Sequence, residues 1–124
     1  MRVATTLVMF TLMVTTPDVH AFWGWMRGTV VTQFETSDWD LLKATAQSTL
    51  NDAADGTQVN WRNEQTGNAG AVKVLLSFEH DARPCRRMAF LNVSSDGARG
   101  VANYSLCRQA NDTWVYVSDS ELAQ

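Results

Sequence analysis

The chain has 124 residues, of which 45% are hydrophobic and 19% are charged, a composition typical of a globular protein with room for one domain. Its formal net charge is −3 and its pI is near 5.2. Because phosphate backbones are bound by basic surfaces, this acidic balance argues against a nucleic-acid partner.

The first 21 residues predict a cleaved secretory signal. Arg2 precedes a short apolar run from Val3 to Val14, and the sequence "VHA" that ends at Ala21 places small residues where a signal peptidase reads them. The run is too short and too rich in threonine to span a bilayer stably. We expect the mature chain to begin at Phe22 and to carry no transmembrane segment. A retained peptide that anchors the chain is the alternative.

Residues 22–36 form a segment that is aromatic at its start, "FWGWM", with Trp23 and Trp25 as candidate binding residues. Exposed aromatic side chains favour docking to a membrane interface or to a protein. They could equally cover the sheet face that lies away from the helix. The stretch "TVVTQF" that follows predicts a short strand or an extended lead-in.

The stretch "TSDWDLLKATAQSTLNDAADG" predicts a helix at the start of a domain over residues 37–118. Ser37 is a natural N-cap, and Asp40 three residues later completes a capping-box pattern. Gly56 marks the end of the helix, because glycine is free to adopt a left-handed conformation. Apolar residues recur at helical spacing on one face. They are Trp39, Leu42, Ala46, Leu50 and Ala53.

The rest of the domain predicts strands, because β-branched and aromatic runs alternate with turn sequences. The runs are "TQVNWRN", "AVKVLLSFEH", "CRRMAFLNV", "VANYSLCRQ" and "TWVYVS". The short separators force neighbouring strands to be antiparallel. We therefore predict an α+β domain, with one N-terminal helix packed on a five-stranded antiparallel meander and stapled by one disulfide. A polar tail follows over residues 119–124.

Cys85 and Cys107 both lie in the mature part, where an oxidising compartment favours a disulfide between them. In an antiparallel hairpin, the numbers of directly opposed residues add up to a constant. If Cys85 and Cys107 face each other, that sum is 192 and the centre of the turn is Asp96, inside "SSDGARG". The even-numbered residues of the hairpin then face the helix, and the cystine lies on the other face with Leu91 and Val93. The even-numbered set is Met88, Phe90, Tyr104 and Leu106.

A metal site is not expected, because His80 would be the only histidine of the mature chain and the cysteines are paired. No cofactor is predicted either. A disulfide also removes the nucleophilic thiol. His80 and Asp81 are adjacent in a predicted strand and would point to opposite faces, which is poor geometry for a catalytic base and its orienting group. The sequence therefore favours a non-enzymatic protein.

The segment "NWRNEQTGNAGAV" lies between the first two strands. Gly67 and Gly70 can adopt backbone angles closed to other residues, and Asn63 and Asn68 tolerate tight turns. Trp61 would add a large apolar surface. The simpler interpretation is a hairpin with a glycine-rich tip. The alternative is that the asparagines and Arg62 form an exposed contact surface.

This segment resembles the signature of the bacterial surface-antigen domain, the family of the rickettsial-type outer-membrane antigens. The similarity continues through the pairs Cys85-Arg86 and Cys107-Arg108 and through "NDTW", which ends at Trp114, so that it covers about residues 40–117. Typical members carry a lipid-anchor cysteine and a glycine-zipper region ahead of the domain, and neither is found here. The resemblance implies a role in the cell envelope and transfers no catalytic residue.

Four arginines should converge at one end of the sheet if the cysteines pair as expected, and they form a second candidate binding surface. Their planar guanidinium groups suit carboxylates and phosphates. The alternative is that they pair with nearby Glu79, Asp81 or Asp112, or simply face water. They are Arg83, Arg86, Arg87 and Arg108.

We therefore expect a secreted, disulfide-bonded protein of the surface-antigen type that acts by binding or by structural support in the Gram-negative envelope. Its expected location is the periplasm, with possible association with the outer membrane. Its partner would be an envelope protein, a lipid or a glycan. The alternative function is a small periplasmic inhibitor or ligand-binding module.

Overall fold

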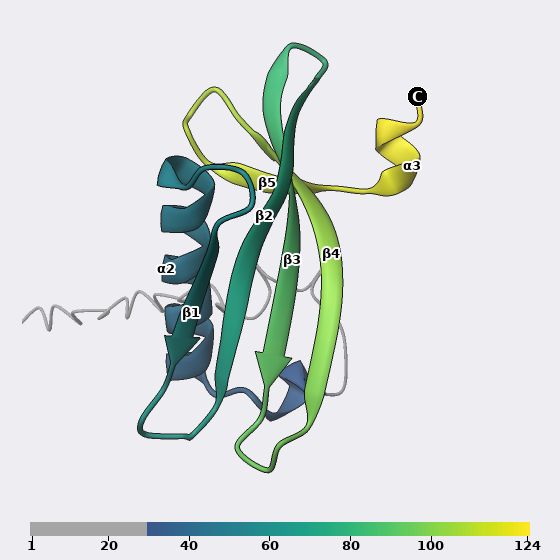
Figure 1. Cartoon of the computed structure of the whole chain (residues 1–124). Coiled ribbons are helices and arrows are strands. Elements are labelled where there is room, and N and C mark those ends of the chain that lie inside the picture. The colour runs from purple at the N-terminus through teal and green to yellow at the C-terminus, as the bar shows by residue number, and fades with distance from the viewer. Residues whose placement is uncertain (1–29) are drawn as a thin grey trace, which may run out of the picture.

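The structure is a computed structural model that describes residues 30–124 of the chain. One long helix lies along one face of a five-stranded antiparallel sheet (Figure 1), which confirms the predicted α+β class. The elements are η1 (Val31–Gln33), α2 (Thr36–Asp52), β1 (Gln58–Arg62), β2 (Ala69–His80), β3 (Arg83–Val93), β4 (Arg99–Arg108), β5 (Trp114–Val117) and α3 (Asp119–Leu122).

The sheet is the predicted meander, with strands in the order β1-β2-β3-β4-β5. Each strand pairs antiparallel with its neighbour in sequence. The β2–β3 turn consists of Asp81 and Ala82, whose φ angles of 49° and 58° are both left-handed. Two such residues in succession match the twist of the flanking strands, which is why a two-residue connection suffices here. One irregularity in the β2–β3 pairing lies between Val74 and Leu76.

Helix α2 begins earlier than predicted. Its N-cap is Glu35, and the carboxylate of Asp38 accepts a hydrogen bond of 2.8 Å from the Glu35 N–H. The prediction of Ser37 as N-cap and Asp40 as its partner was therefore wrong by two residues. The same capping pattern, with an acidic residue at the third helical position, is satisfied by a different pair.

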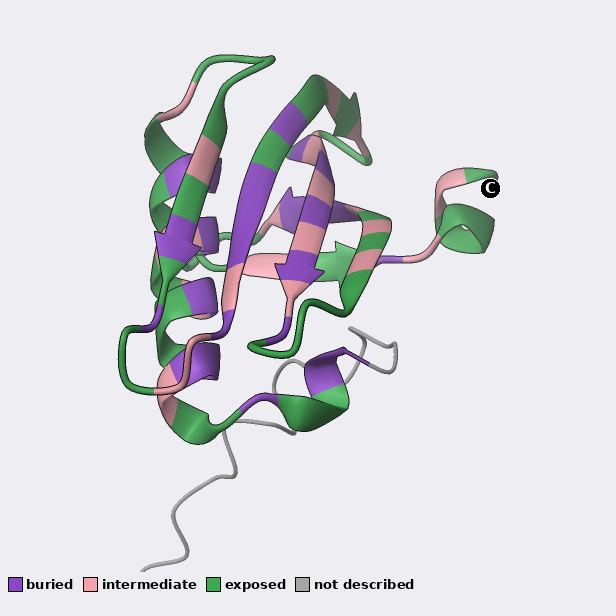
Figure 2. Cartoon of the chain, turned by 60° about the horizontal axis from the view of Figure 1, so that its bottom comes forward, coloured by how far each residue is buried: buried purple, intermediate pink, exposed green. Residues whose placement is uncertain are grey.

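The apolar face predicted for the helix is confirmed. Trp39, Leu42, Ala46 and Leu50 are buried and Ala53 packs against the core. In Figure 2 the buried residues of α2 lie on the side that faces the sheet. The three central strands of the sheet contribute side chains that are fully or almost fully buried. These are Val72, Val74, Met88, Phe90 and Leu106.

The hairpin register inferred from the cysteines is also confirmed. Cys85 and Cys107 form a disulfide and are directly paired, and the same register runs on to Val93 opposite Arg99. The turn between these strands therefore includes Asp96. The even-numbered residues of the hairpin contact the helix-side core, whereas the cystine packs in a separate cluster with Val117.

Two short segments differ from the sequence-based expectation. The stretch "TVVTQF" contains the 3-10 turn η1 rather than a strand. The expected polar tail contains the short helix α3, because the hydroxyl of Ser118 accepts a hydrogen bond of 3.2 Å from the Glu121 N–H. The predicted signal peptide and the candidate binding residues Trp23 and Trp25 lie outside the described residues.

Candidate functional site

The asparagines of the β1–β2 turn are buried, not exposed as a contact surface would require. Asn63 and Asn68 each have an exposed fraction of 4%, and both donate to the carboxylate of Asp38, which has an exposed fraction of 0%. Both donor–acceptor distances are 2.8 Å. The hydroxyl of Thr66 donates to the same carboxylate at 2.6 Å. The turn is thus fastened to the start of helix α2.

Asp38 is the residue that sequence reasoning missed. Its two oxygens accept four hydrogen bonds, from the side chains of Asn63, Thr66 and Asn68 and from the backbone of Glu35. Burial acts to raise the pKa of Asp38, but these hydrogen bonds to the charged form outweigh it and hold the pKa below its usual value. A buried charge is tolerated here because uncharged donors replace its hydration.

The same network extends to the β3–β4 turn. The side-chain oxygen of Asn68 accepts a hydrogen bond of 2.8 Å from the Ser95 N–H. Gly67 has a φ of 77°, and a Cβ placed there would lie 3.1 Å from the Cβ of Ser95. A left-handed residue without a side chain therefore fits where the two turns meet. The predicted hairpin with a glycine-rich tip is what the structure shows.

Trp61 and Gly70 are a matched pair in this hairpin. They face each other across β1 and β2, and a Cβ on Gly70 would lie 2.5 Å from the Nε1 of Trp61 and 2.4 Å from the carbonyl oxygen of Leu91. Only glycine lets the indole lie this close to the strand. Trp61 then packs edge-on against Phe34 with ring centroids 5.5 Å apart. This pair stabilises the core.

The four candidate arginines do not converge. Register places Arg86 and Arg108 on the helix side of the sheet and Arg83 and Arg87 on the opposite face, because neighbouring residues of a strand alternate. Arg87 donates to Ser105 and to Asp119. Arg108 lies 3.2 Å from Asp112. The prediction of one arginine surface was therefore wrong. The alternative holds for Arg108, which pairs with Asp112, whereas Arg87 pairs with Asp119, an acidic residue that was not expected.

Arg86 has an internal role at the C-terminal end of helix α2. It donates to the carbonyl oxygens of Leu50 and Ala53, which the helix itself leaves without partners, and to that of Thr49, which also accepts from the Ala53 N–H. It also donates to Asp55 and Ser77. A guanidinium has five N–H groups, and these five hydrogen bonds use all of them. No donor is left for a ligand.

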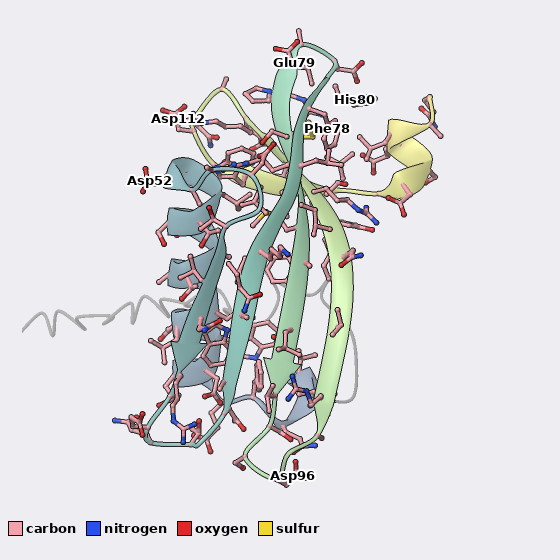
Figure 3. All side chains as sticks on the ribbon, in the orientation of Figure 1. Asp52, Phe78, Glu79, His80, Asp96 and Asp112 are labelled. Carbon is pink, nitrogen blue, oxygen red and sulfur yellow. A yellow bond between two sulfur atoms is a disulfide. The ribbon has the colours of Figure 1, made fainter. Side chains whose placement is uncertain are left out.

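Hydrogen bonds from Ser77 and from the charged Arg86 lower the pKa of the Asp55 carboxyl group. Hydrogen bonds from the Ser94 hydroxyl and the Ala98 N–H lower the pKa of Asp96. Figure 3 labels Asp96 at one end of the sheet and His80 at the other.

His80 and Asp81 do not point apart as expected, because the strand ends between them. The His80 Nε2 lies 3.3 Å from the Asp81 carboxylate.

The sheet face opposite α2 carries a hollow of about 420 Å³ near the β1–β2 and β3–β4 turns. Sequence reasoning did not identify it, although the strand register reveals it. One row across the sheet runs through Arg62, Ala69, Val93 and Arg99. The residues that line this outer hollow are Gln58, Asn60, Trp61, Arg62, Ala69, Gly70, Ala71, Leu91, Val93 and Arg99.

Within residues 30–124, no helix is both long and apolar enough to cross a membrane. In the same part of the chain, no group of three or more histidine, cysteine or acidic side chains is placed to hold a metal ion. The described part of the chain therefore contains a buried polar network, a helix capped at both ends and an open hollow.

Neither a protein-family model nor a solved structure matches the chain. The chain is similar to the 17 kDa surface antigen of Rickettsia prowazekii (strain Madrid E), with 29% identity over 84 residues. The 17 kDa surface antigens of Rickettsia bellii show the same identity. Each match covers 68% of this chain and 53% of the relative, so the chain spans about half the length of these relatives. The similarity supports a distant, surface-antigen-like relationship.

Proposed function

We propose that this protein is a non-enzymatic component of the bacterial cell envelope, which acts by binding or by structural support in the periplasm or at the outer membrane. The observation that carries the proposal is its distant similarity to the 17 kDa surface antigens of Rickettsia. The disulfide between Cys85 and Cys107 agrees with an exported protein, because disulfides persist in oxidising compartments.

The structural roles of the reactive side chains support binding over catalysis. The two cysteines are joined, Asp38 is enclosed by hydrogen bonds, and Arg86 caps a helix. His80 and Asp81 contact each other at a turn, but a histidine–carboxylate pair also needs a nucleophile to form a hydrolytic site. We favour a binding or supporting role for these reasons.

The alternative, a small periplasmic ligand-binding or inhibitory module, is favoured by one observation. The outer hollow is an open concavity that no described element covers, with arginines on two of its walls. Hollows of this volume are of the size that small ligands occupy in proteins.

Location is tested by fractionating cells that express the full-length chain with a C-terminal epitope tag. We expect the protein in the periplasmic or envelope fraction, with both cysteines resistant to alkylation until a reductant is added. Protein found in the cytosol with two reactive thiols would overturn the proposal.

Attachment to the envelope is tested by sedimenting envelopes over a salt series. If the aromatic segment docks the protein, changing Trp23 and Trp25 together to alanine releases it with little dependence on salt, since burial of apolar surface is not screened. Arg108→Gln is the matched test of an electrostatic contact. Arg86 is unsuitable for this purpose, because its loss would uncap the helix.

A further inference from the structure

The outer hollow has a floor of small apolar residues. Ala69 and Ala71 of β2 lie beside Val93 and Leu91 of β3, and directly paired residues of neighbouring strands share a face. Small side chains on β2 next to larger ones on β3 leave the concavity open. Val101, which pairs with Leu91 on the same face, has an exposed fraction of 72%. No described element covers this part of the sheet.

The two walls of the hollow carry polar and cationic groups. Arg62 and Asn60 belong to β1, and Arg99 belongs to β4. Those strands are three spacings apart, about 14 Å between backbones, so the two guanidinium groups stand on opposite walls. An anion between them would be approached from both sides.

The charges of both arginines are open to a ligand. Arg99 is exposed, and its side chain makes no hydrogen bond or ion pair with the other described residues. Arg62 pairs with Glu64 at 3.1 Å, but the two side chains have exposed fractions of 63% and 82%. Exposed ion pairs of this kind contribute little and exchange readily. A carboxylate or phosphate can therefore compete for Arg62.

We propose that the outer hollow binds a short peptide of small residues through its free C-terminal carboxylate. Guanidinium groups bind carboxylates through paired, charge-assisted hydrogen bonds, which Arg99 and Arg62 can supply. The alanine floor accommodates methyl-sized side chains. The amide groups of Gln58 and Asn60 on one wall, which bond to each other at 3.0 Å, suit the polar backbone of a peptide. A bare acyl chain could not pair with the Gln58 side-chain oxygen or the Asn60 N–H groups, which this bond leaves free.

This proposal deepens the binding role proposed above, and it can fail independently of the cellular location. The test uses the purified exported protein and two probes that differ in one group, N-acetyl-trialanine with a free carboxylate and the same peptide as its C-terminal amide. Binding is measured by titration calorimetry and by NMR. We expect the acid to bind at least about tenfold more tightly than the amide, because charged hydrogen bonds are the stronger ones.

Two variants that each remove one positive charge distinguish binding at this site from a general effect of charge. Arg99→Gln should abolish the preference for the acid. Arg83→Gln should retain it, because Arg83 lies on the same face at the other end of β3. Ala69→Met keeps both arginines and fills the hollow. It should therefore weaken the binding of the peptide acid and leave the binding of inorganic phosphate unchanged. The unfolding free energy of each variant serves as the check on folding.

Other outcomes would overturn the proposal. Equal affinity for acid and amide, or an unchanged preference in Arg99→Gln, would exclude carboxylate recognition. If decanoate binds more tightly than the peptide acid and Arg99→Gln removes that binding, the ligand is an acyl anion. If inorganic phosphate alone binds as tightly as the peptide acid, the floor contributes nothing and the peptide is excluded.

Discussion

The two ends of helix α2 are fixed by opposite arrangements of charge. At the N-terminal end the charge belongs to the helix, where the buried carboxylate of Asp38 accepts donors from the β1–β2 turn. At the C-terminal end it belongs to the sheet, where Arg86 of β3 donates to helix carbonyls. Both arrangements suit the helix dipole, which favours anions at its start and cations at its end.

The difference between the ends is one of burial. Asp38 has an exposed fraction of 0%, whereas the side chain of Arg86 has one of 12% and its partner Asp55 is half exposed. Loss of a charge in a dry network leaves several donors without acceptors, while water can replace part of a network at the edge. The N-terminal end should therefore be the more sensitive of the two.

The largest effect is expected for Asp38→Ala. The change leaves the buried side-chain amide of Asn68 without its acceptor and removes one of the two acceptors of Asn63, whose other is the Ser37 hydroxyl. We therefore expect the free energy of unfolding to fall by about 3–5 kcal/mol. Denaturant titration measures it. Asp40→Ala, an exposed position on the same helix, is the control and should change stability by less than about 0.5 kcal/mol. A loss below about 1 kcal/mol for Asp38→Ala would show that the buried network adds little.

The next effect concerns the disulfide, which lies beside Arg86 in sequence. Replacing Cys85 and Cys107 together by alanine should lower the free energy of unfolding by about 3 kcal/mol, on the loop-entropy estimate for a bridge with a sequence separation of 22. The measurement is denaturant titration of oxidised wild type and of the variant. Equal stability of the two proteins would mean that the β3–β4 register holds without the bridge.

Arg86→Gln should have a smaller effect than Asp38→Ala, about 1.5–3 kcal/mol, because water can reach part of the exposed carbonyl groups. Arg87→Gln is the matched control, since its side chain is more exposed, at 29%, and bonds the hydroxyl of Ser105 and the exposed Asp119 rather than helix carbonyl groups.

The double variant of Asp38→Ala with Arg86→Gln sharpens the comparison. The helix has 17 residues and is therefore about 25 Å long. Sites this far apart should have additive effects, within about 0.5 kcal/mol. A larger deviation would show that the helix responds as one unit when either end is released.

The smallest effect is a dependence on pH. Because the folded-state pKa of Asp38 is below its usual value, its contribution to stability is fully present above the unfolded-state pKa, about 4, and is lost as pH falls through the folded-state value. The difference in unfolding free energy between wild type and Asp38→Asn should thus narrow as pH falls below about 4. Asp55 and Asp96 titrate in both proteins and cancel. A constant difference would contradict the assignment.

Much of the fold was predictable because its signals are local. The turn at "SSDGARG" and the two cysteines agreed on one register, and the apolar spacing of α2 identified its buried face. The alternation along β3 could also have corrected the prediction for the arginines. Arg86 is even-numbered, so it belongs to the helix side with Met88 and Phe90. The convergence of four arginines could not follow from that register.

The roles of the polar residues were not predictable from spacing. Ser37, Asp38 and Asp40 are all acceptable residues near a helix start. Ser37 and Asp38 both accept from Asn63, and only the further tertiary contacts with Thr66 and Asn68 select Asp38. Likewise, the alternation of "RNEQTGN" does not reveal whether its asparagines face water or a helix. Prediction of the outer hollow would have required the register of four strands at once.

The meander also bears on the order in which the chain can fold. Every strand pairs with its neighbour in sequence, so each hairpin can form before the next has been completed. Helix α2 is different, because its contacts with Asn63, Asn68 and Arg86 bridge 25 to 37 residues. Pairing of near neighbours is associated with rapid folding, since little chain entropy is lost before contacts form. The docking of α2 is therefore the step that we expect to limit the folding rate.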